Sequence, residues 1–397
     1  MGDPIGIGVI GLGESGQHHL DVIHGDRVRP QAPAVAAKTT LFQTGKQFAK
    51  SVLGRERPAP PPVPNPDHPA MENLKVVAIS DVDEGRLTEA KARFGVSNAW
   101  TDYKRLLARE DVQAVLISTP PMFHREITIE AARHGKHILC EKPMALSSTG
   151  CLEMLDAVQK AGVVLQIGYM LRFSSERGRI AEVIRNNQIG RPVFYREMIS
   201  LRAGGDQMWI HDQNLGGGPL WEVSHGIDFL RSVFGDPETV FGIGGRYKPN
   251  KTSAIDTYAA SLMFRSGDKA LIGDSYALKN FGWDNEACRK HRTEIDVIGP
   301  GGYMQFPDAD LSNRLTICAY SEPDDRIEKI RWTSVWGAAE DGYRKQLEHF
   351  VECIKEGKTP IVSGVEGFKT VQLVEAIMES IQTGETRKLT ARNEPLG

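Results

Sequence analysis

The chain has 397 residues, enough for two domains that each bury a core. Its net charge of −3 and pI near 6.4 give no basic surplus for a phosphate backbone, and no apolar run approaches the roughly 18 residues of a membrane span. We therefore expect neither nucleic acid nor a membrane as a partner. The sequence begins without an apolar leader, and its five cysteines lack zinc or disulfide spacing, so we expect a cytoplasmic protein without a metal site.

The first segments predict a dinucleotide-binding turn. Residues 5–10 form a strand pattern, and the Gly-Leu-Gly-Glu-Ser-Gly sequence of residues 11–16 then opens a helical stretch over residues 17–23. Glycines at this spacing allow a tight turn in which the helix N-terminus faces a pyrophosphate. Asp81 ends the second strand pattern, residues 74–81, where a carboxylate accepts hydrogen bonds from both ribose hydroxyls and repels a 2′-phosphate. The pattern therefore favours NAD over NADP.

An insertion of about residues 26–70 separates the glycine-rich turn from the second strand, which normally follows after roughly 20 residues. It contains a basic helical pattern over residues 36–53 and a proline-rich stretch that should be extended. Its place between helix and strand puts it at the amino edge of the sheet, opposite the expected crevice. It is either a tolerated surface excursion or an oligomerisation arm or docking surface.

Strand and helix patterns continue to alternate up to residue 168, which predicts a doubly wound Rossmann domain of the α/β class over residues 1–168. The strand patterns cover residues 112–118, 137–140 and 163–168. The helical patterns cover residues 84–94, 103–109, 125–134 and 147–161.

After residue 168 the pattern changes to successive strands with short polar turns, which predicts an antiparallel meander. The β-type runs are residues 192–200, 239–247, 258–265, 270–277, 293–298, 314–320 and 327–332, and the helical patterns are residues 176–187, 341–356 and 365–383. We expect residues 169–397 to form an α+β domain for substrate binding and oligomerisation, with a large, mostly antiparallel open sheet. A free face of such a sheet predicts a homo-oligomer, dimer or tetramer.

A charged pair, Glu141-Lys142, stands directly after the apolar run 137–140 and directly before Pro143. The pair therefore lies at the carboxyl end of a buried strand, where open α/β sheets bind ligands. A lysine there can donate to a substrate oxygen and, if partly desolvated, exchange a proton near neutral pH. The alternative is a solvated pair in a turn.

A second group of chemical side chains follows the glycines 216–218. If the chain is helical from about Leu220, then Glu222, His225 and Asp228 share one face. A histidine flanked by carboxylates is oriented and kept basic, as a general base requires. The alternative is a buried histidine that is satisfied by its neighbours.

Together these motifs resemble the glucose-fructose oxidoreductase/inositol dehydrogenase/rhizopine-catabolism (Gfo/Idh/MocA) family over nearly the whole chain apart from the insertion. The resemblance implies a Rossmann domain with an α/β domain, a nicotinamide cofactor, and oxidation of a secondary hydroxyl on a sugar, cyclitol or related compound. The motifs that carry it are Gly11-x-Gly13-x-x-Gly16, Asp81, Ser118-Thr-Pro120, Glu141-Lys142-Pro143, Gly168-Tyr-x-x-Arg172-Phe and Gly216-Gly-Gly…His225-x-x-Asp228.

The resemblance places the catalytic residues at Lys142 and His225. Inositol-dehydrogenase-like members carry an aspartate four residues before the histidine, where this chain has Trp221, with Glu222 three before; the third catalytic partner is therefore open. Expected cofactor contacts are Gly11, Leu12, Gly13, Glu14, Ser15, Gly16, Asp81, Ser118, Thr119, Pro120, His124, Glu141, Lys142 and Arg172. Expected substrate contacts are Lys142, Tyr169, Trp209, His211, Trp221, Glu222 and His225.

The sequence thus predicts an NAD-dependent dehydrogenase acting on a secondary hydroxyl of a sugar, glycoside or cyclitol. One alternative is a redox-neutral glycosidase or lyase, in which tightly bound NAD oxidises the substrate transiently at C3; it needs a further base, for which His124, Tyr169 or His211 are candidates. Another is a non-catalytic NAD-sensing regulator, against which the presence of Lys142 and His225 weighs.

Overall fold

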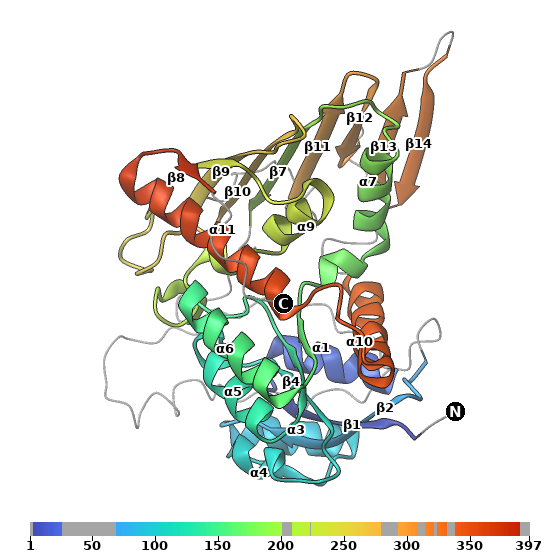
Figure 1. The fold of residues 1–397 in the computed structure, drawn as a ribbon, viewed down its shortest axis with the longest axis vertical. Helices are drawn as coiled ribbons and strands as arrows, with labels where there is room; N and C mark the ends of the chain where they lie inside the picture. The colour runs from blue at the N-terminus through green and yellow to red at the C-terminus, as the bar shows by residue number, and fades with distance from the viewer. Residues whose placement is uncertain are drawn as a thin grey trace.

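A computed structural model describes residues 3–25, 69–200, 209–222, 224–278, 293–308, 314–320, 324–331 and 338–389. The chain forms two layered domains (Figure 1). One contains a parallel sheet with helices on both faces, and the other a larger sheet with helices against one face. Within the described ranges, no helix combines the length and the apolar character needed to cross a membrane.

The first domain is built on a six-stranded sheet in the order β3-β2-β1-β4-β5-β6, with every pairing parallel. Strand β4 is buried at all four positions, as expected for a strand covered on both faces. This confirms the predicted Rossmann-type sheet. The strands are β1 (Ile5–Ile10), β2 (Leu74–Ser80), β3 (Ala99–Trp100), β4 (Ala114–Ile117), β5 (His137–Cys140) and β6 (Leu165–Ile167).

The helices of this domain begin and end at residues suited to caps. Asp83 accepts N–H groups of the first turn of α3, Ser147 does the same for α6, and Gly25 ends α1 in the left-handed conformation. Helix α1 begins at Glu14, three residues before the predicted start. The helices are α1 (Glu14–His24), α3 (Glu84–Phe94), α4 (Tyr103–Leu107), η1 (Pro121–Phe123), α5 (His124–Arg133) and α6 (Ser148–Ala161).

Helix α10 (Ala338–Glu356) comes from the C-terminal part of the chain but packs beside α1 (Figure 1). Its buried side chains Tyr343, Leu347 and Phe350 belong to the same core as Ile7 and Leu20. The first core is therefore completed by residues far beyond 168. Chain order alone does not divide the two cores.

The second domain contains a nine-stranded sheet in the order β14-β13-β12-β11-β7-β10-β9-β8-β15. Most pairings are antiparallel, but β7 pairs parallel with β10 and lies in the middle of the sheet. The predicted meander is thus wrong for β7, because the chain leaves β7 through a helical segment and resumes near the far edge at β8. The strands are β7 (Phe194–Ser200), β8 (Thr239–Gly245), β9 (Thr257–Met263), β10 (Lys269–Ser275), β11 (Thr293–Gly299), β12 (Gly302–Phe306), β13 (Arg314–Ala319), β14 (Arg326–Arg331) and β15 (Arg387–Lys388).

Helices cover the inner face of this sheet, where α7, α9 and α11 share one apolar core with β7 and β10. Strand β12, which sequence patterns did not predict, completes the run between β11 and β13. The remaining helices are η2 (Met170–Phe173), α7 (Ser175–Arg185), η3 (Trp209–His211), α8 (Pro219–Glu222), α9 (Ser224–Phe234) and α11 (Gly364–Thr383).

Most of the insertion, residues 26–68, lies outside the described residues, and so do its predicted helix and proline-rich stretch. The two ends of the insertion meet. An added Cβ on Gly25 would lie 2.4 Å from the backbone N of Ala70, and the Met71 N–H donates to the Ile23 carbonyl at 2.9 Å. The insertion therefore leaves and re-enters the fold at one point.

Candidate active site

The glycine-rich turn between β1 and α1 has the geometry of a phosphate cradle. Gly11 has φ +94°, and an added Cβ there would lie 2.6 Å from the carbonyl oxygen of Ser118. A Cβ on Gly16 would lie 2.1 Å from the Gly11 carbonyl oxygen, whereas nothing lies within 4 Å of one on Gly13. No side chain caps the N-terminus of α1, so its N–H groups are available to an anion. The turn fits the pyrophosphate of a dinucleotide.

Asp81 lies at the carboxyl end of β2, where its carboxylate is fixed by the backbone. It accepts the N–H of Leu12 at 2.6 Å and the N–H of Asp83 at 2.9 Å. The exposed guanidinium of Arg86 stands 3.7 Å from the same carboxylate. Asp81 therefore stands at the end of β2 with a cation beside it that the sequence patterns did not reveal, and its contact with a ribose stays a prediction.

His124 joins the loops that follow β4 and β5. Its two ring nitrogens each lie 2.8 Å from a backbone carbonyl oxygen, one of Thr119 and one of Pro143. The side chain is completely buried, and burial lowers the pKa of its imidazole. His124 thus holds the Lys142 loop against the Ser118–Pro120 loop, and its own contact with a cofactor stays a prediction.

Lys142 reaches from the end of β5 to helix α8 of the second domain. Its Nζ donates to the backbone oxygen of Glu222 at 2.9 Å and forms an ion pair with Glu222 Oε1 at 2.8 Å. The lysine side chain is 9% exposed, so the pair is largely shielded from water yet lies at the domain boundary. This contact brings Glu222 onto Lys142, and the catalytic role of Glu222 stays a prediction.

His225 lies on α9, and its surroundings differ from those expected. Burial, with the charge of Lys142 added, lowers the pKa of His225 to about 3, against the opposing effect of Glu141. Its Nδ1 has no hydrogen-bond partner among the described residues, and the ring of Tyr169 packs edge-on at 5.8 Å. The prediction that flanking carboxylates keep this histidine basic is wrong, because Glu222 pairs with Lys142 and Asp228 points elsewhere.

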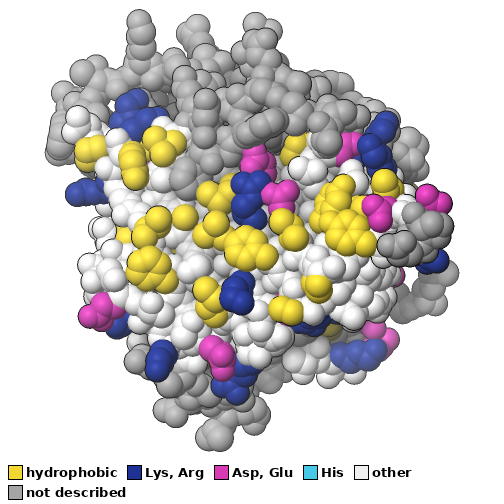
Figure 2. Space-filling model, turned by 90° about the horizontal axis from the view of Figure 1, so that it is seen from above, with side chains coloured by type: hydrophobic (Ala, Val, Ile, Leu, Met, Phe, Trp, Pro, Cys, Tyr) yellow, Lys and Arg dark blue, Asp and Glu magenta, His cyan; other side chains and the backbone are white. Residues whose placement is uncertain are grey.

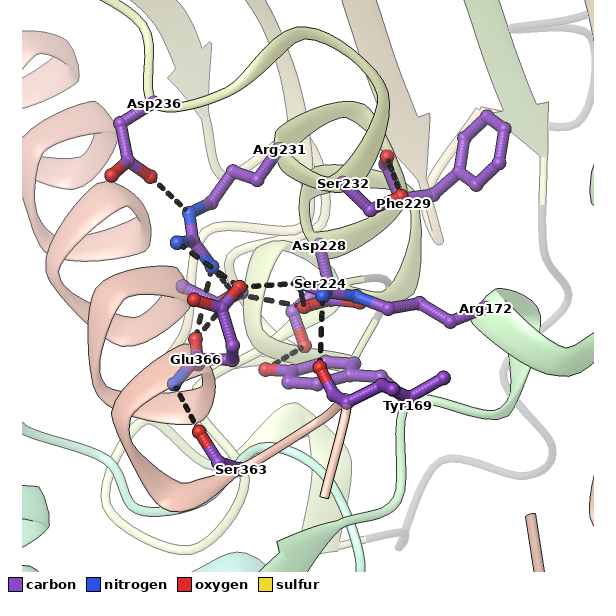
Figure 3. Close-up of polar contacts among 12 residues, drawn as sticks. Tyr169, Arg172, Ser224, Asp228, Phe229, Arg231, Ser232, Asp236, Ser363 and Glu366 are labelled. Carbon is purple, nitrogen blue, oxygen red and sulfur yellow. Dashed lines mark hydrogen bonds and ion pairs between the residues drawn. The ribbon is translucent and has the colours of Figure 1, made fainter. Parts of the chain in front are cut away.

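Asp228 binds Arg172 at the junction of the two domains (Figure 3). Arg172 Nε and one terminal nitrogen each donate to an Asp228 oxygen at 2.7 Å, and the same terminal nitrogen reaches Glu366 at 2.8 Å. Arg231 joins the network through Glu366 on α11. The guanidinium of Arg172 is thus held between two carboxylates, and its predicted cofactor contact stays a prediction.

Two tryptophans pack against the glycines 216–218. A Cβ on Gly216 would lie 2.6 Å from the Trp209 ring, and one on Gly217 would lie 2.3 Å from the Trp221 ring. The ring of His211 in turn lies 6.0 Å from that of Tyr276 on the inner side of the sheet. Close approach to the aromatic rings explains the glycines, and the substrate contacts expected of Trp209, His211 and Trp221 stay predictions.

A cavity of about 490 Å³ lies beside α8. Apolar side chains and amide, hydroxyl and charged groups all line it. Neither Lys142 nor His225 lines it; Trp221, which precedes Glu222, does. The lining residues are Leu146, Gln213, Gly217, Trp221, Arg246, Ser253, Ile255, Glu375, Met378, Glu379 and Gln382.

The sequence patterns missed one buried pair in the site. His19 Nε2 donates to Glu141 Oε1 at 2.8 Å, although 122 residues separate the two. The available signal was the position of His19 one helical turn after Gly16, which turns both residues toward the sheet. Among the described residues, no group of three or more His, Cys, Asp or Glu is arranged to hold a metal ion.

Comparison with known proteins agrees with this geometry. The profile of an oxidoreductase family with an NAD-binding Rossmann fold matches residues 60–169, and that of its C-terminal α/β domain matches residues 181–389. The myo-inositol 2-dehydrogenase of Thermotoga maritima is 30% identical over 328 residues, covering 80% of this chain and 94% of its own length.

Two further proteins are less similar in sequence to this chain. The NADP-dependent D-xylose 1-dehydrogenase 2 of Haloferax volcanii is 26% identical over 319 residues, covering 79% of this chain and 92% of its own. The crystal structure of the aldose-aldose oxidoreductase of Caulobacter crescentus, complexed with glycerol, superposes with a TM-score of 0.71 at 24% identity, covering 97% of this chain and all of its own. The last similarity concerns the fold.

Proposed function

Because the chain belongs to the Gfo/Idh/MocA family of NAD-binding oxidoreductases, we propose that it oxidises a secondary hydroxyl of a sugar, glycoside or cyclitol with NAD. The observation that carries this proposal is the Lys142–Glu222 pair at the carboxyl end of β5, with His225 on the next helix, α9, where the charge of Lys142 lowers its pKa. That end of the sheet also carries the glycine-rich turn. Relatives named as inositol and xylose dehydrogenases support the same class of substrate.

The residues that would hold the cofactor are the turn 11–16, Asp81 and the Ser118–Pro120 loop. The N-terminus of α1 receives the pyrophosphate, and Asp81 receives the ribose hydroxyls. When bound, the nicotinamide accepts the hydride from the carbinol carbon. Asp81 favours NAD, while Arg86 beside it limits how strongly a 2′-phosphate is repelled.

The protein's own part is to place the hydroxyl and to handle its proton. Lys142 donates a hydrogen bond to the substrate oxygen, and Glu222 fixes the direction of the lysine side chain. His225, neutral because it is buried, has a free lone pair with which to take the hydroxyl proton. The rings of Trp209 and Trp221 offer an apolar face to a substrate ring, and the polar residues that line the adjacent cavity offer groups that bind hydroxyls.

The dehydrogenase is favoured over a redox-neutral glycosidase by the surroundings of the candidate second base. His124 and Tyr169 are fully buried, and burial raises the pKa of the Tyr169 phenol. Both side chains are therefore enclosed by the protein in this structure. His211 is partly exposed and remains the one candidate base of the three with solvent access.

A homo-oligomer formed through the outer face of the large sheet is the second part of the proposal. Figure 2 looks down on the second domain and shows hydrophobic side chains spread across that side of the molecule. Cross-strand pairing places these residues on one face, which no described helix covers. The apolar residues that are at least 38% exposed on this face are Phe194, Phe241, Ile243, Met263, Ile298 and Ile327.

We infer that the partner on this face is a second copy of the same chain, because the charged side chains near the centre of the face are mutually complementary. Arg196 pairs with Glu294 and Asp296 across neighbouring strands, so two copies related by a two-fold axis can exchange these pairs. Light scattering of Ile298→Asp should show a smaller mass than that of the unchanged protein.

We place the protein in the cytoplasm, supported by the described cysteines Cys140, Cys151, Cys318 and Cys353, all buried free thiols.

The deciding experiment is a panel of sugars, cyclitols and glycosides offered with NAD and with NADP, followed by nicotinamide absorbance. We expect reduction of NAD with at least one polyol that carries a ring hydroxyl, and product mass lower by two hydrogens. A glycoside that loses its leaving group without net NADH formation would instead support the redox-neutral reaction.

A further inference from the structure

The cavity of about 490 Å³ beside α8 is lined by five separate parts of the chain. Four belong to the second domain: residues 213–217, α8, the loop between β8 and β9, and α11. The fifth is the loop after β5, which carries Lys142 and contributes Leu146. Small-molecule sites usually have volumes of about 300–1,000 Å³. The cavity can therefore hold a ligand of the size of a sugar ring.

The parts that line the cavity are tied to their neighbours by hydrogen bonds. The backbone oxygen of His211 accepts the N–H of Ser253 at 3.0 Å, and the Ser253 hydroxyl accepts the N–H of Gln213 at 2.9 Å. On α11, the Glu375 carboxylate accepts the N–H of Ser148, at the start of α6, at 2.8 Å. Helices α6 and α11 lie side by side (Figure 1). A ligand therefore does not have to order these walls when it binds.

The side chains that line the cavity suit a neutral ring with many hydroxyls. Trp221 is buried and the three aliphatic or thioether chains are half-buried, whereas the polar chains other than Glu375 are exposed. The charged groups are one cation, Arg246, and two carboxylates, Glu375 and Glu379. This balance does not favour an anionic ligand. Hydroxyls can donate to the carboxylates and accept from the guanidinium and the amides.

The cavity and the Lys142–Glu222 pair share two segments of the chain. Trp221 lines the cavity, and the next residue of α8, Glu222, pairs with Lys142. Leu146 also lines the cavity and follows Lys142 by four residues on the same loop. A ligand in the cavity is therefore a near neighbour of the pair. Because neither Lys142 nor His225 lines the cavity, a ring bound there is not the ring that reacts.

We propose that this cavity is a subsite for a second, unoxidised sugar ring, and that the substrate class is a neutral two-ring glycoside rather than a free monosaccharide or cyclitol. The inference rests on the dehydrogenase function proposed above. One ring presents its hydroxyl to Lys142. The second ring packs against the apolar side chains of the cavity, and its hydroxyls bind the polar ones. Hydride and proton leave only the first ring.

The test uses matched sugars that share a non-reducing ring. Methyl β-D-glucopyranoside is paired with cellobiose, and methyl α-D-glucopyranoside with maltose and with trehalose. The measured quantity is kcat/KM from nicotinamide absorbance. We expect at least one disaccharide to exceed its methyl glycoside by about 10-fold or more, because the second ring adds hydrogen bonds and apolar contacts in a preformed site.

Filling the cavity should remove this advantage. Met378→Trp fills it from α11, and we expect kcat/KM for the disaccharide to fall about 10-fold more than that for its methyl glycoside, because the second ring loses its space. Gln382→Trp fills it from an exposed position, so the test stands even if Met378→Trp does not fold. Leu152→Trp is the matched control, because Leu152 is 42% exposed on α6 and does not line the cavity.

Calorimetric titration with the same sugars in the absence of NAD separates this inference from the proposed function. The unchanged protein should bind at least one disaccharide about 10-fold more tightly than its methyl glycoside. The variants Met378→Trp and Gln382→Trp should lose this difference, whereas Leu152→Trp should keep it. Circular dichroism establishes that each variant is folded.

The inference is overturned if the methyl glycosides are oxidised as efficiently as every disaccharide of the panel. It is also overturned if the cavity-filling variants lower kcat/KM equally for both members of a pair. If the unchanged protein oxidises no sugar at all, the proposed function fails, and the titrations decide about the cavity. Disaccharide binding that the filling variants weaken supports the subsite, and binding that they leave unchanged, or no binding, contradicts it.

Discussion

Two clusters of cations and carboxylates join the domains, and they differ in how the cation is held. Lys142 has a single carboxylate, Glu222, and one backbone oxygen. Arg172 has two carboxylates, Asp228 and Glu366, and donates to the first through two parallel hydrogen bonds (Figure 3). A planar guanidinium held at both edges is fixed, whereas an ammonium on a flexible stem can turn toward a new acceptor.

The difference separates a reacting group from a supporting one. Arg172 and Asp228 connect the start of the second domain to α9, the helix that carries His225. Glu222 precedes α9 on the short helix α8 and pairs with Lys142. In the proposed function, the Arg172 cluster therefore fixes where His225 stands, and the Lys142 cluster supplies a proton donor that can move. Substitutions should affect stability at the first cluster and turnover at the second.

The largest expected effect is on stability at the Arg172 cluster. Asp228→Ala leaves a buried guanidinium with one carboxylate fewer, and breaking a buried pair in this way costs about 3 kcal/mol or more of unfolding free energy. Urea denaturation measures it. Asp156→Ala removes an exposed pair with Lys160 and serves as control, with a change within about 0.5 kcal/mol. If Asp228→Ala and Asp156→Ala had the same unfolding free energy, the Arg172 cluster would not have the supporting role that distinguishes it from the Lys142 cluster.

Lys142→Ala should show the opposite profile. We expect kcat about 100-fold lower or more, with NAD affinity within a few-fold, because proton transfer and positioning typically contribute 10²–10⁴. Lys136→Ala is the matched control: Lys136 precedes β5 at its amino end and donates to the Arg109 carbonyl at 2.8 Å, away from the crevice. Near-normal turnover by Lys142→Ala would contradict a catalytic role for Lys142. A loss of NAD affinity as large as the loss of kcat would indicate that Lys142 binds the cofactor instead.

Asp81→Ala should change neither turnover at saturation nor stability strongly, but should change cofactor choice. The ribose hydroxyls lose an acceptor, and Arg86 is left to attract a 2′-phosphate, so the preference for NAD should narrow by about 10-fold. Fluorescence titration with NADH and NADPH measures both affinities. Arg86→Ala should shift the preference in the other direction. A protein that already prefers NADP before substitution would contradict the role given to Asp81.

Sequence patterns predicted the positions of most elements because burial leaves a local periodicity. The apolar strands around β1 and β4 and the motif residues at their carboxyl ends were found where expected. The strand order of the second sheet was not, because the parallel pairing of β7 with β10 depends on a crossover that no local pattern encodes. The return of α10 to the first core is equally non-local.

The same limit applies within the site. Lys142, His225 and the glycine-rich turn could be identified from their residue types and flanking sequence. Their partners could not, since 80 residues separate Lys142 from Glu222 and 122 separate His19 from Glu141. The prediction that Glu222, His225 and Asp228 share one helix face is wrong. Helix α8 ends at Glu222 and α9 starts at Ser224, so Glu222 lies on a different helix from the other two residues.

The smallest effect on chemistry is expected from replacing residues 26–68 by a short Gly-Ser turn, which tests whether anything beyond the two clusters is needed. The ends of the insertion, Gly25 and Ala70, already touch at the end of α1, away from the crevice. We therefore expect kcat and NAD affinity within about two-fold of the unchanged protein, since a surface excursion with adjoining ends can be removed with little strain.

The basic and proline-rich composition of the insertion predicts an effect on association instead. Light scattering should then show a lower mass, or denaturation should show stability lost on dilution. Ile298→Asp on the outer sheet face is the comparison variant, because it disrupts the proposed interface while keeping the insertion. The deletion could instead abolish turnover while fold and mass stay unchanged. The insertion would then have to contribute to an active site, in addition to the Lys142 and Arg172 clusters.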